Sequence, residues 1–237
     1  TTLVVDYSDT NNTAVSGVVD NETVGVNGSI GYGNRRLGTL SVVGQYQTTD
    51  YSRDNTLPGL MSADGIDVWN VGLQYQREVG NRLEGRIGVG YGRVKTRAGT
   101  TRDNSTMTAD VGLNYAVSSR LRAGLSYSRN ASSTIIEGID YILNDQAQAT
   151  VAYSLSPRLS ANAAVGWTKR RYKGEVDPLL LGTPRNEEIV RVSTGVSMRV
   201  GRRSTLSLDA QYQDRNTDVP TLSFDSVRVG VTAATSF

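Results

Sequence analysis

Apolar side chains recur at every second position in twelve short stretches of this chain. In the last stretch, Val227, Val229 and Val231 alternate with Arg228 and Gly230. A period of two predicts β-strands with one apolar and one polar face, because successive side chains of a strand point to opposite sides. The twelve stretches cover residues 2–7, 24–32, 40–46, 69–76, 83–91, 107–115, 121–127, 147–155, 159–167, 190–198, 206–212 and 226–237.

Connections between these stretches alternate between tight turns and longer polar segments. Arg occurs in all five tight turns, which are residues 34–36, 80–82, 118–120, 156–158 and 201–203. Most of the carboxylates, including Asp103, Glu187 and Glu188, are expected in the six longer segments or at their margins. This alternation predicts an all-β, 12-stranded antiparallel up-and-down sheet in one domain over residues 1–237. A β-propeller has a similar period, but its blades need four strands each, whereas each repeat here has two.

Aromatic residues lie at both ends of the apolar faces. One row ends the strands that lead into long loops: Tyr7, Tyr46, Tyr91, Tyr127, Trp167 and Tyr212. The other lies beside the tight turns: Tyr32, Tyr75, Tyr115, Tyr153 and Phe237. Two such rows around a band of Val, Leu and Ala are typical of a β-barrel at its two lipid–water interfaces. A soluble sheet would be expected to scatter aromatics along its core face.

The alternating last strand that ends in Phe237 resembles bacterial outer-membrane β-barrel proteins, although Thr235 departs from their pattern. The turns and the strands ending in Tyr resemble the β-barrel porins, some of which accompany exopolysaccharide export systems. The resemblance implies a transmembrane barrel with short periplasmic turns, longer extracellular loops and both termini in the periplasm. It also implies contact with outer-membrane lipid and lipopolysaccharide, and assembly by the barrel-assembly machinery through the C-terminal strand. Thr1 already lies in a strand pattern, so we expect that a signal peptide or an upstream segment preceded it.

The amino-acid composition excludes several classes of catalytic and metal-binding site. The 237 residues include no Cys and no His, which excludes thiol chemistry, Ser–His triads and His metal sites. The formal net charge is only +2, and the Arg residues are scattered, so we expect no nucleic-acid partner. Mean hydropathy is −0.34, and no apolar run reaches the length of a membrane helix. We therefore expect no enzyme activity, no cofactor and no metal.

The polar faces are rich in Gly, Asn and Gln, which predicts a hydrated lumen. No aromatic track and no charge ladder of one sign lines it, which argues against a dedicated sugar or phosphate channel. We expect a passive outer-membrane channel for small, mostly neutral hydrophilic solutes. The alternative is a non-enzymatic scaffold or translocator barrel of an exopolysaccharide, autotransporter-like or adhesion system, with partners that the sequence does not identify.

One group of lumen charges lies on strands that become neighbours if the barrel closes. Asp6, Arg191, Asp209 and Arg228 all lie on polar faces of the first, tenth, eleventh and twelfth strands. We expect alternating Arg–Asp contacts there, with Arg228 shared between two carboxylates. Each pair in a hydrated pore would contribute about 1 kcal/mol or less.

Overall fold

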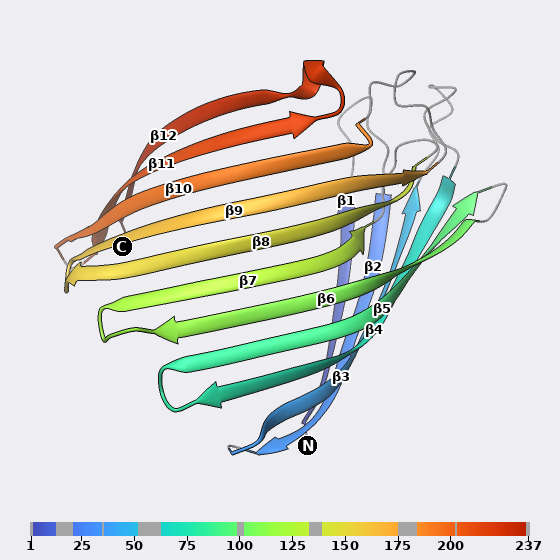
Figure 1. Cartoon of the computed structure of the whole chain (residues 1–237), viewed down its shortest axis with the longest axis horizontal. Coiled ribbons are helices and arrows are strands. Elements are labelled where there is room, and N and C mark those ends of the chain that lie inside the picture. The colour runs from blue at the N-terminus through green and yellow to red at the C-terminus, as the bar shows by residue number, and fades with distance from the viewer. Residues whose placement is uncertain are drawn as a thin grey trace.

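The computed structural model describes residues 2–12, 21–34, 36–51, 63–98, 102–132, 139–174, 184–201 and 203–235. They form one antiparallel sheet in which each strand pairs with the next along the chain (Figure 1). A short 3-10 helix, Pro220–Leu222, precedes the last strand, and no helix in these segments is long and apolar enough to cross a membrane. The strands are β1 Thr2–Asn12, β2 Asn21–Asn34, β3 Gly38–Tyr51, β4 Ala63–Val79, β5 Leu83–Ala98, β6 Arg102–Ala116, β7 Leu121–Ser132, β8 Ile139–Ser156, β9 Leu159–Gly174, β10 Asn186–Val200, β11 Ser204–Thr217 and β12 Phe224–Thr235.

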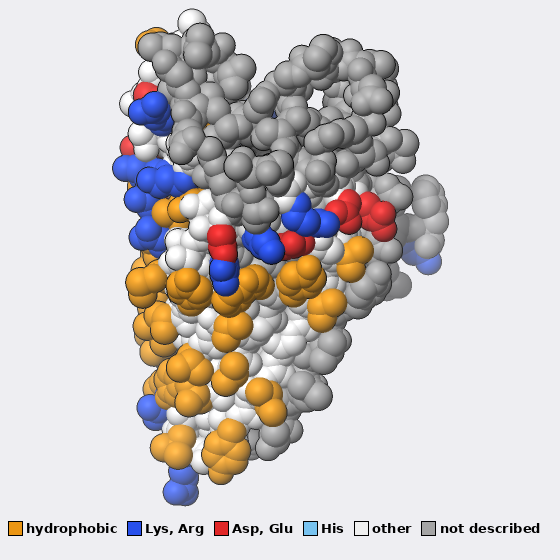
Figure 2. All heavy atoms as spheres, turned by 90° about the vertical axis from the view of Figure 1, so that its right-hand side faces the viewer, with side chains coloured by type: hydrophobic (Ala, Val, Ile, Leu, Met, Phe, Trp, Pro, Cys, Tyr) orange, Lys and Arg blue, Asp and Glu red, His pale blue; other side chains and the backbone are white. Residues whose placement is uncertain are grey.

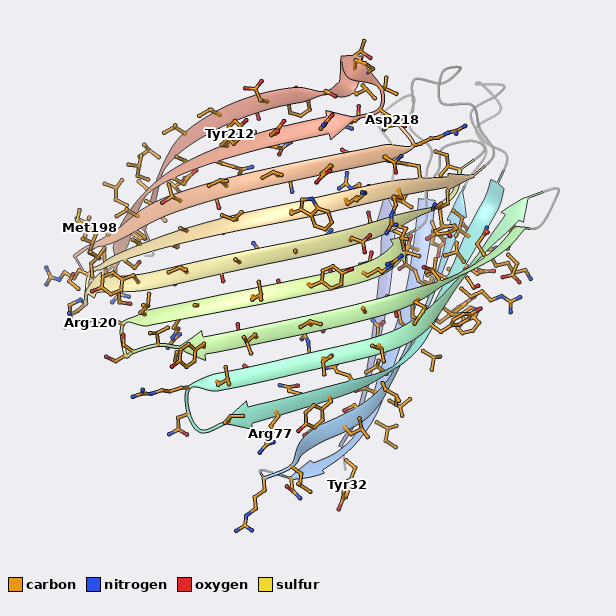
Figure 3. All side chains as sticks on the ribbon, viewed as in Figure 1. Tyr32, Arg77, Arg120, Met198, Tyr212 and Asp218 are labelled. Atoms are coloured by element: carbon orange, nitrogen blue, oxygen red, sulfur yellow. The ribbon has the colours of Figure 1, made fainter. Side chains whose placement is uncertain are left out.

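The all-β, antiparallel, up-and-down arrangement expected from the sequence is confirmed, and the five tight turns lie between the predicted strands. Side chains stabilise three of these turns. The Asn34 Oδ1 atom accepts hydrogen bonds from two backbone N–H groups, and the Ser118 and Ser156 Oγ atoms do the same in their turns. Such bonds are the reason why Asn and Ser favour turns. In Figure 3, Arg120 and Met198 mark this tight-turn end of the sheet.

The strands extend further into the long connections than the hydrophobic alternation predicts. Only residues 99–101 separate β5 from β6, and pairing continues to Thr96 opposite Arg102. Asp103, Glu187 and Glu188 are therefore strand residues at the margins of the long connections, and not loop residues. Backbone pairing does not require apolar side chains, so alternation marks only the part of each strand that presents an apolar face.

The two faces of the sheet differ sharply in composition. Register aligns the alternating apolar positions across all neighbouring strands, and most of these side chains are exposed: Val89 is 57% and Leu208 53% accessible. We call this side the apolar face and the opposite side the polar face. Figure 2 shows a broad area of hydrophobic side chains, with Lys, Arg, Asp and Glu side chains lying beyond it. So large an exposed apolar surface is abnormal for a soluble protein.

The sheet curls (Figure 1), and residues of its polar face on several strands line one common cavity, which places that face on the inner side of the curl. Gly72 and Gly90 lie opposite each other on this face of β4 and β5. A Cβ atom on Gly72 would come within 2.8 Å of the Val89 carbonyl oxygen, and one on Gly90 within 2.8 Å of the Val71 carbonyl oxygen. The curvature at this point therefore depends on residues without side chains, as is usual at barrel corners.

The end of β7 that leads to its long connection leaves the wall and turns toward the polar face. Pairing between β6 and β7 stops at Ala109 opposite Arg129, although both strands continue. Beyond this fork, β5 contacts β7 and β8 directly. Ala131 and, on β8, Tyr141 pack against polar-face side chains of β4 and β5, including Ile66, which is 1% exposed. This small core holds the ends of β7 and β8 inside the mouth of the sheet.

Candidate functional site: the polar face

The polar face contains a cavity of about 400 Å³. Strands β2 to β6 form its wall, and the inward-turned part of β7 contributes Ser128, Arg129 and Asn130. Gly72, Gly88 and Gly90 form part of the wall, so that ligands there can approach the backbone. This volume falls within the range of roughly 300 to 1,000 Å³ that is typical of small-molecule sites.

Side-chain amides line this cavity and have unused hydrogen-bonding capacity. Asn27, Gln45 and Gln74 all contribute to its wall, and their side chains make no hydrogen bond within the described part of the protein. An amide has two N–H donors and a carbonyl acceptor. The cavity therefore offers both kinds of group to water or to a solute.

The charged groups near the cavity are mostly paired. Asp110, at its edge, accepts a hydrogen bond of 2.5 Å from the Arg86 Nε atom. Arg129 lies 3.7 Å from Asp145, which also accepts a hydrogen bond from Arg171. Asp145 is buried at the fork and accepts a further hydrogen bond of 2.8 Å from the Tyr127 hydroxyl group. These contacts hold the ends of β7, β8 and β9 together.

The predicted ionic patch is not assembled among the described side chains. Arg191 donates a hydrogen bond of 2.9 Å to the Gln213 Oε1 atom instead of a carboxylate. Arg228 and Asp209 form no ion pair with any described side chain. Arg228 lies opposite Gln211 and Asp209 lies opposite Gly230, so the two charges are diagonal neighbours one inward position apart. Arg86 and Asp110 stand in the same diagonal relation and do form an ion pair, so register alone does not separate Arg228 from Asp209. Asp6 lies on β1 opposite Asn27, and its side chain is outside the described set.

A different ionic cluster lies on the polar face, and the sequence reasoning missed it. The Glu187 side chain is only 2% exposed and lies 2.6 Å from Arg215 and 3.4 Å from Arg170. The Tyr172 hydroxyl group donates a hydrogen bond of 2.9 Å to the same carboxylate. The Arg215 guanidinium also lies 5.7 Å from the centre of the Phe224 ring. If the alternation of the tenth stretch is continued back to residue 187, it places this carboxylate on the polar face. Its partners, however, depend on the register of β9, β10 and β11.

The predicted aromatic residues lie on the apolar face in two rows. Register aligns Tyr32, Tyr75, Tyr115 and Tyr153 toward the tight turns, and Tyr46, Tyr91, Tyr127, Trp167 and Tyr212 toward the long connections. Trp69 joins the second row, opposite Tyr46 and 5.9 Å from the ring of Tyr91. Tyr7 lies on β1 opposite Val26, with its side chain outside the described set, and Phe237 is outside the described residues.

Three aromatics of the second row donate hydrogen bonds to carboxylates on the next strand. Each carboxylate lies two residues beyond the aromatic residue's direct partner, toward the long connections. The pairs are Tyr46 with Asp67 at 3.4 Å, Tyr127 with Asp145 at 2.8 Å, and Trp167 with Glu188 at 2.5 Å. The polar atoms of these rings thus point away from the apolar band, toward the charged part of the sheet.

That charged part also holds ion pairs between neighbouring strands. Arg97 on β5 lies 2.7 Å from Asp50 on β3 and 3.4 Å from Asp67 on β4, and Arg93 pairs with Asp103 on β6. At the same end, Asp218 accepts hydrogen bonds of 3.0 Å from the Arg185 backbone N–H group (Figure 3). Within the described residues, no group of three acidic side chains is arranged to hold a metal ion.

A curled sheet with an exposed apolar outer face and a polar, amide-lined inner face defines the class of membrane-spanning β-barrel proteins. A family model described as "Putative beta-barrel porin 2" matches residues 43–237. The chain belongs to this porin family, which confirms the resemblance seen in its turns and strands.

Solved structures with a similar fold are outer-membrane transporters and channels. The FrpB iron transporter from Neisseria meningitidis is 12% identical with a TM-score of 0.65, over 84% of this chain and 36% of that protein. The channel DcaP of Acinetobacter baumannii is 13% identical with a TM-score of 0.57, over 97% of this chain and 83% of that one. The copper transporter OprC is 12% identical with a TM-score of 0.58, over 90% of this chain and 40% of that one. This chain thus spans little more than a third of FrpB, and the likeness concerns the fold. No curated protein matches the sequence.

Proposed function

We propose that the chain closes into a twelve-stranded outer-membrane barrel and works as a passive channel for small hydrophilic, mostly neutral solutes. The observation that carries this proposal is the contrast between the two faces. The apolar face exposes Val, Leu and Ile to the surroundings, whereas the polar face carries amides and glycines. Membership of a porin family and the fold of the channels and transporters support the same conclusion, and they favour a non-enzymatic barrel.

The aromatic rows support a placement in the membrane. We assign the row beside the tight turns to the periplasmic interface and the row that includes Trp167 to the outer interface, with the long connections outside and both termini in the periplasm. Lys95 and Lys169, at apolar-face positions beyond the outer row, form no ion pair with described side chains. Their ammonium groups would contact the phosphates of outer-leaflet lipid and lipopolysaccharide. Assembly through the C-terminal strand by the barrel-assembly machinery belongs to the same proposal.

Purified protein in a planar lipid bilayer should give stable single-channel current steps with weak selectivity between cations and anions. We expect weak selectivity because charges near the cavity, such as Arg86 and Asp110, are paired with opposite charges. Liposomes that contain the protein should swell in isosmotic solutions of small neutral solutes. A folded, inserted barrel that passes no current and causes no swelling would contradict the channel and favour a scaffold role.

Closure of the sheet can be tested with disulfides, because the chain contains no Cys. A cysteine at Val5 of β1 would be combined in turn with cysteines at Val227, Val229 and Val231 of β12, all at apolar-face positions. If β1 pairs with β12, one or two neighbouring combinations should form an intramolecular disulfide, because only Cβ atoms about 3.5 to 4.5 Å apart can be bridged. The control combines Val5 with a cysteine at Val165 of β9, which should not react. Absence of a disulfide in all three combinations would show that β1 and β12 are not neighbours.

A further inference from the structure

We propose that the cavity between the wall of β2 to β6 and the inward-turned end of β7 is a binding site for small uncharged polyhydroxy compounds, such as linear polyols. This inference deepens the proposed channel function and rests on it. The cavity is more than the concave side of a curved sheet. The end of β7 leaves the wall where its pairing with β6 stops, and a hydrophobic core holds it on the inner side. The site therefore has a wall and a facing segment.

The hydrogen-bonding groups of the cavity match hydroxyl groups. Asn27, Gln45 and Gln74 lie on three neighbouring strands and have no partner within the described protein. Each amide can donate and accept, and each hydroxyl group of a polyol can also donate and accept. A chain of adjacent hydroxyl groups can therefore bind several amides at once, whereas an ether such as a polyethylene glycol only accepts along its length.

The charges of the cavity favour an uncharged ligand. Among the described side chains, its lining includes one carboxylate, Asp110, and one guanidinium, Arg129, and these two formal charges cancel. Asp110 is already paired with Arg86, and Arg129 lies beside Asp145. A charged solute would lose hydration without finding a free counter-charge, and desolvation of an unpaired charge is costly.

The glycines of the wall and the aromatic content of the lining determine how tightly we expect a polyol to bind. Gly88 and Gly90 remove side chains from the wall, so a flexible ligand can lie close to the strand backbone. No aromatic side chain of the described residues lines this cavity, so binding to them depends on hydrogen bonds that compete with water. We expect half-saturation in the millimolar range, which allows a solute in a channel to be released again.

Saturation-transfer NMR with the full chain in detergent micelles tests the site without requiring conduction. Sorbitol is the probe, tetraethylene glycol controls for size, and gluconate has the length of sorbitol but carries a carboxylate. We expect saturable transfer to sorbitol and little to the other two compounds. The double variant Gln45→Met/Gln74→Met should raise the half-saturating sorbitol concentration roughly tenfold, because it removes two neutral hydrogen-bonding groups.

The variant Gln146→Met is the matched control, since Gln146 lies on the polar face of β8 outside this cavity. It should bind sorbitol as the unchanged protein does. The Gln45 and Gln74 side chains make no hydrogen bond with the described residues, so their replacement should not impair folding, which the heat-modifiable migration of the protein checks. No transfer to sorbitol, equal binding by the double variant, or binding of gluconate alone would each overturn the proposal. If the protein binds sorbitol but passes no current, the proposed channel function is wrong and the proposed binding site still stands.

Discussion

Replacing Glu187 by Gln should lower the free energy of unfolding by about 3 kcal/mol, the low end of what the loss of one partner from a buried ion pair costs. The carboxylate is 2% exposed and is shared by Arg215, Arg170 and Tyr172 on two neighbouring strands. A neutral amide in its place leaves two guanidinium groups side by side without a counter-charge. The low end applies because the Arg215 and Arg170 side chains remain 25% and 39% exposed and keep part of their hydration.

Urea unfolding in lipid vesicles, followed by tryptophan fluorescence, measures this loss. Asp214→Asn is the control, because Asp214 precedes Arg215 on the apolar-face side of β11 and forms no described contact. Its effect should stay within about 0.5 kcal/mol, as is usual for surface positions. Adding Arg215→Met to Glu187→Gln should cost less than the sum of the two single changes, because both remove the same contact. Additive losses would show that the two groups are not coupled.

Replacing Gly90 by Ala should destabilise the folded sheet by about 2 kcal/mol, in the range observed for overpacking. The new Cβ atom would lie 2.7 Å from the Thr108 Oγ1 atom and 2.8 Å from the Val71 carbonyl oxygen. The hydroxyl group can rotate away, but the carbonyl belongs to the backbone of β4. Relief therefore requires the curl between β4 and β5 to open, which would weaken the cavity as well.

Gly166→Ala is the matched control for this prediction. Gly166 also lies on the polar face, on β9, but a Cβ atom there would meet nothing within 4 Å. It should leave stability unchanged or raise it slightly, because Ala restricts the unfolded chain more than Gly does. Refolding into vesicles, scored by the fraction of protein with heat-modifiable migration, compares the two variants. If both refold equally well, the close approach at Gly90 does not determine the curvature.

The structure also shows why the hydrophobic alternation predicts strands that are too short. Inside the bilayer each strand must present apolar side chains to lipid, and the alternation follows from that demand. Beyond the outer aromatic row, register continues through Arg93, Lys95 and Asp103 with charged residues on the same face. A pattern of apolar positions cannot detect such extensions, and polar segments that look like loops are partly paired strands.

By itself, the sequence determined the strand order, the five tight turns and, within the alternating stretches, the face of the sheet to which a residue belongs. These features follow from local rules. Side chains alternate along a strand, and turns favour residues such as Asn34 and Ser118, whose side chains accept hydrogen bonds from the backbone. The cluster around Glu187, the curl at Gly72 and Gly90 and the inward turn of β7 were decided by the tertiary structure alone. Each depends on the register between neighbouring strands or on where their pairing stops. Parity gives the side of the sheet on which a residue lies, but contacts across strands depend on the height of each residue in its strand, which only the assembled sheet defines.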